Sequence, residues 1–76
     1  MVKYFFDIVR KGHPEYDYQG REFSSLEKAM QLAELIALDL EISPQGEWVG
    51  SSVTLRDQRG RKLFTRTIGE PELMAA

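Results

Sequence analysis

Basic and aromatic side chains gather in the segment SSVTLRDQRGRKLFTRTI, residues 51–68. Five of its residues are cations and one phenylalanine lies among them: Arg56, Arg59, Arg61, Lys62, Arg66 and Phe64. An aromatic ring can stack on a nucleic-acid base while neighbouring cations hold the phosphates. The segment therefore raises nucleic-acid binding as the first chemical hypothesis.

Alternation within this segment predicts which cations share a surface. DQRG, residues 57–60, fits a type I turn with a left-handed glycine, so residues 51–57 and 61–68 are expected to form a hairpin. In a regular register, one face carries Val53, Leu55, Leu63 and Thr65 and should meet the rest of the core. The other face carries Thr54, Arg56, Lys62, Phe64 and Arg66.

This basic and aromatic surface, Arg56, Lys62, Phe64 and Arg66, has three interpretations. Long cationic side chains commonly cover an exposed aromatic, and a charged edge discourages aggregation between strands. The surface could instead bind a protein or a nucleic acid. The formal net charge is −2, with 10 basic and 12 acidic residues, which counts against nucleic acid.

Enzymatic chemistry finds little support in the sequence. The single histidine, His13, has no set of neighbours suited to a metal, and the chain has no cysteine. Phosphate-binding and nucleophile motifs do not occur in it. We expect no catalytic residue, no metal, no cofactor and no small-molecule substrate.

A helix is predicted from Ser24 to Ile42, with Ser24 and Glu27 forming a capping box. Apolar residues recur at helical spacing along one side of it: Leu26, Ala29, Met30, Ala33, Ile36, Ala37 and Leu40. The helix should end by Ser43, because the residue before a proline avoids the helical conformation. This inner side of the helix is expected to face a sheet.

Three further apolar residues, Leu35, Leu38 and Ile42, point away from that inner side, by about 100–180° around the helix. An apolar patch of this kind calls for cover. Either Trp48 and the connector after the helix fold over it, or it forms a self-association interface. Phe5, on the second face of the first strand, is added to this candidate interface.

Strands are predicted at residues 2–9 and 16–23, and in the hairpin. The order of elements is then β-β-α-β-β in a single α+β domain at residues 1–70, with a frayed tail at 71–76. One helix should pack on a mostly antiparallel four-stranded sheet. The simplest sheet order places the segments 16–23, 2–9, 51–57 and 61–68 side by side.

The length and composition of the chain are typical of a small globular domain. The chain has 76 residues, of which 42% are hydrophobic and 29% charged. No apolar run reaches the roughly 18 residues needed to span a membrane, and the first residues lack a signal-peptide layout. We expect a cytoplasmic protein.

The order of four short motifs resembles a known family. YFFDI at residues 4–8 is followed by Asp17, Gly20 and Glu22, then by Leu26 and Ala29 at the start of the helix, then by Asp57, Gly60 and Arg61. This pattern is similar to that of domain-of-unknown-function family 6894, small bacterial proteins seen mostly in alphaproteobacteria. The resemblance implies a compact β-β-α-β-β domain and assigns no catalytic role.

These observations favour a small non-enzymatic domain that self-associates or binds a protein partner. Its expected assembly is a homo-oligomer, with a homodimer as the simplest form. Nucleic-acid binding through the basic 56–66 hairpin is the alternative hypothesis, and no membrane partner is expected.

Overall fold

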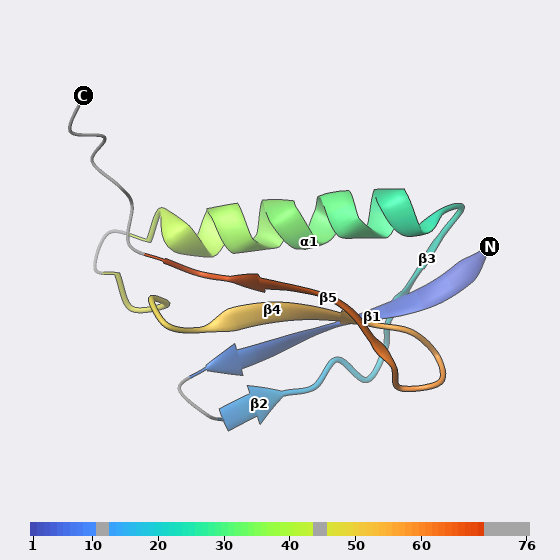
Figure 1. Cartoon of the computed structure of the whole chain (residues 1–76), viewed down its shortest axis with the longest axis horizontal. Coiled ribbons are helices and arrows are strands. Elements are labelled where there is room, and N and C mark those ends of the chain that lie inside the picture. The colour runs from blue at the N-terminus through green and yellow to red at the C-terminus, as the bar shows by residue number, and fades with distance from the viewer. Residues whose placement is uncertain (11–12, 44–45, 70–76) are drawn as a thin grey trace.

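The computed structural model describes residues 1–10, 13–43 and 46–69. In this part of the chain, the elements are β1 Val2–Arg10, β2 His13–Glu15, β3 Arg21–Phe23, α1 Leu26–Glu41, β4 Ser52–Arg56 and β5 Lys62–Thr67. Figure 1 shows α1 lying along one face of the antiparallel sheet. The predicted α+β class is therefore confirmed, whereas the predicted tail at 71–76 lies outside the described residues.

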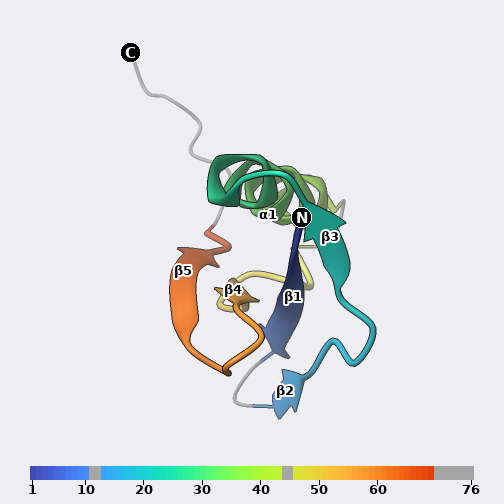
Figure 2. The ribbon, with the colours of Figure 1, turned by 90° about the vertical axis from the view of Figure 1, so that its right-hand side faces the viewer.

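The sheet has five strands instead of four. Its order is β2-β1-β4-β5, and β3 pairs separately with β1. The predicted order of segments is confirmed, but the single strand at 16–23 is wrong. Only its last three residues, 21–23, form a strand (β3), and β2 precedes the predicted segment at residues 13–15, so two short strands lie along the same side of β1 (Figure 2).

The core lies between α1 and the sheet. Ala29, Ala33 and Ala37 are fully buried, and Val53 and Leu55 of β4 are fully buried opposite them. Because alanine side chains are small, the helix axis can approach the sheet closely while larger residues fill the flanks. The predicted inner side of the helix is confirmed, except that Leu26 at its first turn is 39% exposed.

The helix begins one residue later than predicted. Ser25, and not Ser24, is the N-cap, and its hydroxyl accepts a hydrogen bond from the amide of Lys28 at 3.3 Å. Ser25 has the extended conformation that an N-cap requires. Position N3 is therefore Lys28, so the predicted capping box between Ser24 and Glu27 is wrong.

The β4–β5 hairpin contains a bulge, which is absent from the regular register predicted from the sequence. Arg56 pairs with Lys62, but Leu55 pairs with Phe64, so Leu63 is the extra residue. From there on every side chain of β5 is exchanged between the two faces. The bulge turns Phe64 towards the helix, where it packs against buried residues of both core clusters.

The turn of this hairpin forms as expected. The amide of Asp57 donates to the carbonyl of Arg61 at 3.0 Å, and Gly60 has a φ of 83°. In the part of the chain that the structure describes, no helix has the length and apolar content needed to cross a membrane.

Candidate functional site

The outer helix face, which we define as Leu35, Leu38 and Ile42, lies on the side of α1 away from the sheet. The three residues are 62%, 48% and 74% exposed, as their spacing predicted. Trp48 does not cover them, because it packs against the core cluster and lies under the guanidinium of Arg10, 4.5 Å from the ring centre. The alternative in which Trp48 shields this face is therefore wrong.

Phe5 belongs to a different surface. It lies on the face of the sheet opposite α1, next to Arg56, whose guanidinium carbon is 4.7 Å from the centre of the Phe5 ring. Phe5 is only half-buried, and the aromatic ring and the cation cover each other. The predicted interface of four residues is therefore divided between two opposite sides of the molecule.

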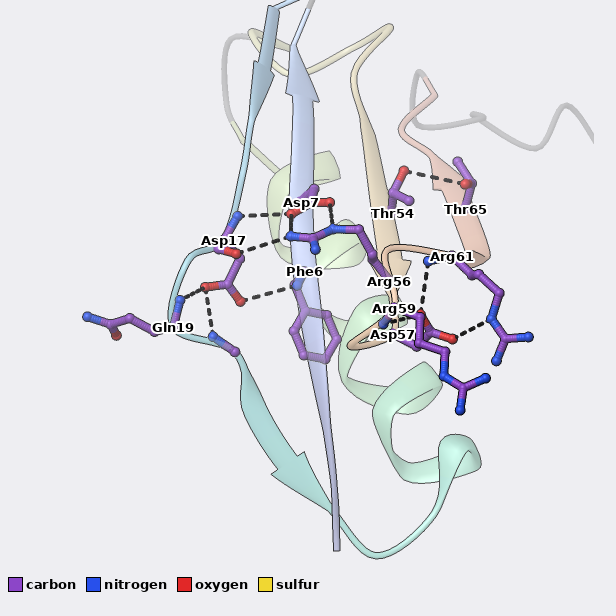
Figure 3. Close-up of polar contacts among 11 residues, drawn as sticks. Phe6, Asp7, Asp17, Gln19, Thr54, Arg56, Asp57, Arg59, Arg61 and Thr65 are labelled. Carbon is purple, nitrogen blue, oxygen red and sulfur yellow. Dashed lines mark hydrogen bonds and ion pairs between the residues drawn. The ribbon is translucent and has the colours of Figure 1, made fainter.

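A buried ion pair joins β1 to β4 beside Phe5. Asp7 is 4% exposed, and its carboxylate accepts hydrogen bonds from Nε of Arg56 at 2.7 Å and from Nη2 at 3.2 Å (Figure 3). The bond to Asp7 raises the pKa of Arg56. A second donor, the amide of Asp17 at 2.9 Å, completes the environment of this carboxylate.

Asp17 holds the turn at residues 16–20 against the edge of β1. Its carboxylate accepts hydrogen bonds from the amides of Phe6, Gln19 and Gly20 at 3.2, 3.0 and 3.1 Å. Its carbonyl accepts a further bond from Arg56 at 3.3 Å. Burial opposes the charge of Asp17, but the three amide donors and the nearby Arg56 outweigh it and lower its pKa.

Gly20 closes this turn and has a φ of 70°. A Cβ atom at Gly20 would lie 2.9 Å from Cγ of Lys3 and 2.9 Å from Cε1 of Phe5. Glycine is therefore required both by the backbone conformation and by the close approach to β1. We name Asp7, Asp17, Gly20 and Arg56 the carboxylate–arginine network.

Reasoning from the sequence had missed this network as a unit. The signals available were a charged residue, Asp7, inside an otherwise apolar strand and a D-x-x-G turn at Asp17. Neither signal identifies Arg56 as the partner, because Arg56 is 49 residues from Asp7 in the sequence. Its hydrogen bonds join β1, the turn at residues 16–20 and β4, so the network helps to hold the fold together.

The predicted basic and aromatic surface does not form as a unit. Arg66 lies on the helix side of β5, where it pairs with Glu34 at 3.1 Å and with Glu41 at 2.7 Å. The hydrogen bond that Arg66 donates to Glu34 is the main reason that the pKa of Arg66 is raised. Phe64 faces the same side, so only Arg56 and Lys62 remain together on the face away from the helix.

A shallow hollow of about 280 Å³ lies on that face. It is lined by Asp7, Val9, Pro14, Tyr16, Thr54 and Lys62. Pockets for small organic ligands usually measure roughly 300–1,000 Å³. The carboxylate of Asp7 is already bonded to Arg56 and to the Asp17 amide, which leaves the hollow few polar groups with which to orient a ligand.

Metal ligands do not converge in the described ranges. No group of three or more histidine, cysteine, aspartate or glutamate side chains there is arranged to hold a metal ion. His13 lies exposed in β2, where its partner in the ladder is Arg10.

The family of the chain is shown by comparison with known sequences. The sequence model described as a domain of unknown function, DUF6894, matches residues 3–69, so the chain belongs to this family. The match includes the carboxylate–arginine network and both D-x-x-G turns. Searches of curated proteins and of solved structures found no significant match.

Proposed function

We propose that this DUF6894 domain is a non-enzymatic module that associates with a second copy of itself through the outer helix face. The observation that carries the proposal is the exposure of Leu35, Leu38 and Ile42, which average well over half exposed on a helix whose other side packs on the sheet through three fully buried alanines. Burial of apolar surface of this kind is favourable by about 25 cal/mol per Å². A cytoplasmic location belongs to the same proposal, and the cysteine-free sequence is compatible with it.

The size of the domain supports this proposal. Its core contains few large, fully buried side chains: Leu55, Ile68 and Val53 are the apolar ones among the described residues. Small domains of this kind frequently gain stability from association, because a single small core supplies little free energy. A second copy on α1 would extend the core without altering the sheet.

Nucleic-acid binding through the hairpin loses support from the contacts of its cations. Among the described residues, Arg56, Arg61 and Arg66 each form an ion pair with a carboxylate of the same chain. Phosphate binding by these residues would have to compete with those pairs. Phe64, which was expected to stack on a nucleic-acid base, packs against the core instead.

Replacing Leu38 with glutamate tests the proposed association. At micromolar concentration, light scattering after size exclusion is expected to give a dimer for the wild type and a monomer for Leu38→Glu, because the substitution places a charge in the interface. Tyr18→Glu is the matched control, since Tyr18 is 86% exposed in a turn remote from α1. This control should remain dimeric.

A monomeric wild type whose mass is unchanged by Leu38→Glu would refute self-association. Binding of single- or double-stranded probes at low salt, weakened by Lys62→Ala, would instead favour the nucleic-acid alternative.

A further inference from the structure

Four exposed residues of α1 and its exposed C-cap residue follow the spacing of a coiled-coil seam. Their numbers advance by three and four in turn: Lys28, Gln31, Leu35, Leu38 and Ile42. This is the spacing of a and d positions in a heptad repeat. The amide of Ile42 still donates to the carbonyl of Leu38 at 3.2 Å, so the seam follows helical geometry to its last residue.

The seam is divided into a polar and an apolar part. Lys28 and Gln31 lie in its N-terminal part, and the outer helix face forms its C-terminal part. A partner helix must therefore be placed so that at least Leu35 and Leu38, in the middle of the seam, meet apolar residues. Among the residues that the structure describes, the sheet packs on the opposite side of α1 and no other element lies over the seam (Figure 2).

We propose that two copies pair their α1 helices antiparallel, with Leu35 of each copy against Leu38 of the other. This inference rests on the proposed function and specifies its geometry. The two central layers are then leucine against leucine. Ile42 of each copy lies against Gln31 of the other, where the methylene groups of the glutamine can cover it.

Charge complementarity selects this antiparallel arrangement. The last turn of α1 contains no basic residue, and Arg66, which reaches this end of the helix from β5, bonds to the carboxylates of Glu34 and Glu41. The partial negative charge of the last helical carbonyl groups can therefore still attract a cation from a second copy. In the proposed register, Lys28 of the second copy lies about 4.5 Å beyond Ile42 along the helix axis, within reach of those carbonyl groups. A basic side chain at a helix C-terminus is favourable.

A parallel pair would be less favourable. It would match Leu35, Leu38 and Ile42 with their equivalents, but it would also place Lys28 against Lys28 of the other copy and align the two helix dipoles. Like charges at facing positions are repulsive. The charge of Lys28 and the helix dipoles therefore favour opposite helix directions.

Disulfide crosslinking distinguishes the two directions, and the absence of native cysteine leaves no background thiols. Gln31 and Ile42 are 11 residues apart, about 16 Å along one helix, whereas a disulfide needs Cα atoms within about 7 Å. The variant Gln31→Cys/Ile42→Cys therefore cannot close within one chain. In the proposed pair it should form a covalent dimer upon mild oxidation.

The single variants complete the experiment. Gln31→Cys and Ile42→Cys alone should each remain without a crosslink, because equal positions are about 16 Å apart in the antiparallel pair. Tyr18→Cys measures crosslinking by random collision. Both substituted helix positions are exposed, and circular dichroism checks that the variants remain folded.

The possible outcomes separate this geometry from self-association itself. Efficient crosslinking by Gln31→Cys alone would show a parallel pair and overturn the proposed direction. A dimer in light scattering that crosslinks no better than Tyr18→Cys would place the interface elsewhere. A monomer in all measurements would refute the proposed function as well.

Discussion

Two turns of this protein share the pattern D-x-x-G, but one is bonded to distant strands and the other only to its own hairpin. In both, the aspartate carboxylate accepts the amide two residues later, Gln19 for Asp17 and Arg59 for Asp57, at 3.0 and 2.9 Å. Both end in a glycine with positive φ, 70° at Gly20 and 83° at Gly60. The local turn chemistry is the same.

Their remaining partners differ. Asp57 bonds to the amide of Arg61 at 2.9 Å and to its guanidinium at 2.8 Å, both within four residues. Asp17 instead bonds to Phe6 on β1, and its carbonyl bonds to Arg56 on β4. The first turn therefore ties three segments together, whereas the second only closes its own hairpin.

The largest expected difference between the turns comes from their arginines. Arg56→Ala should lower the free energy of unfolding by about 3 kcal/mol, because it leaves the buried carboxylate of Asp7 without its cation. Arg61→Ala removes a side chain that is 68% exposed and should leave the unfolding midpoint close to that of the wild type. Urea denaturation measures both. Equal losses for the two variants would contradict the distinction between a long-range and a local turn.

The glycines should give the next largest effect. Gly20→Ala is expected to destabilise the fold by about 2 kcal/mol, since it combines a left-handed backbone with contacts of 2.9 Å to Lys3 and Phe5. At Gly60 a Cβ atom meets nothing within 4 Å. Gly60→Ala should therefore lower the free energy of unfolding only through the left-handed backbone conformation, by about 1 kcal/mol. Thermal unfolding of the two variants compares them directly, and a larger loss at Gly60 would be inconsistent with the packing around Gly20.

Acid pH should give the smallest effect. The pKa values of Asp17 and Asp57 are lowered in the fold, that of Asp57 chiefly by the Arg61 amide. The unfolded chain therefore binds protons first, so the stabilisation is present above the ordinary aspartate pKa of about 3.9 and is lost as pH falls through the lowered folded values. Asp17→Asn and Asp57→Asn should each make the stability of the fold depend less strongly on pH in the acid range.

The measurement is the urea midpoint between about pH 5 and about pH 3. Wild-type and variant curves should approach each other as the pH falls, because the unfolded chain takes up protons below the ordinary aspartate pKa and the stabilisation from each carboxylate declines. Parallel curves would show that neither carboxylate contributes through its charge.

The sequence by itself determined the elements whose signals are local. Helical spacing identified the inner side of α1 and the outward direction of Leu35, Leu38 and Ile42, and the DQRG turn located the final hairpin. The order of motifs also identified the family. These features depend on backbone preferences and periodicity within a few residues, which a single sequence displays.

Tertiary structure decided the register of β5 and the carboxylate–arginine network. Alternation alone placed Phe64 and Arg66 on the outside, but the bulge at Leu63 turns the partly buried aromatic ring towards the core and brings Arg66 to Glu34 and Glu41. A one-residue shift is invisible to local propensity, because it is selected by the burial of a large side chain against the helix. Asp7 and Arg56 meet only when β1 pairs with β4. The pattern of apolar residues specifies that such a sheet forms, whereas the packed structure determines which charges its strands bring together.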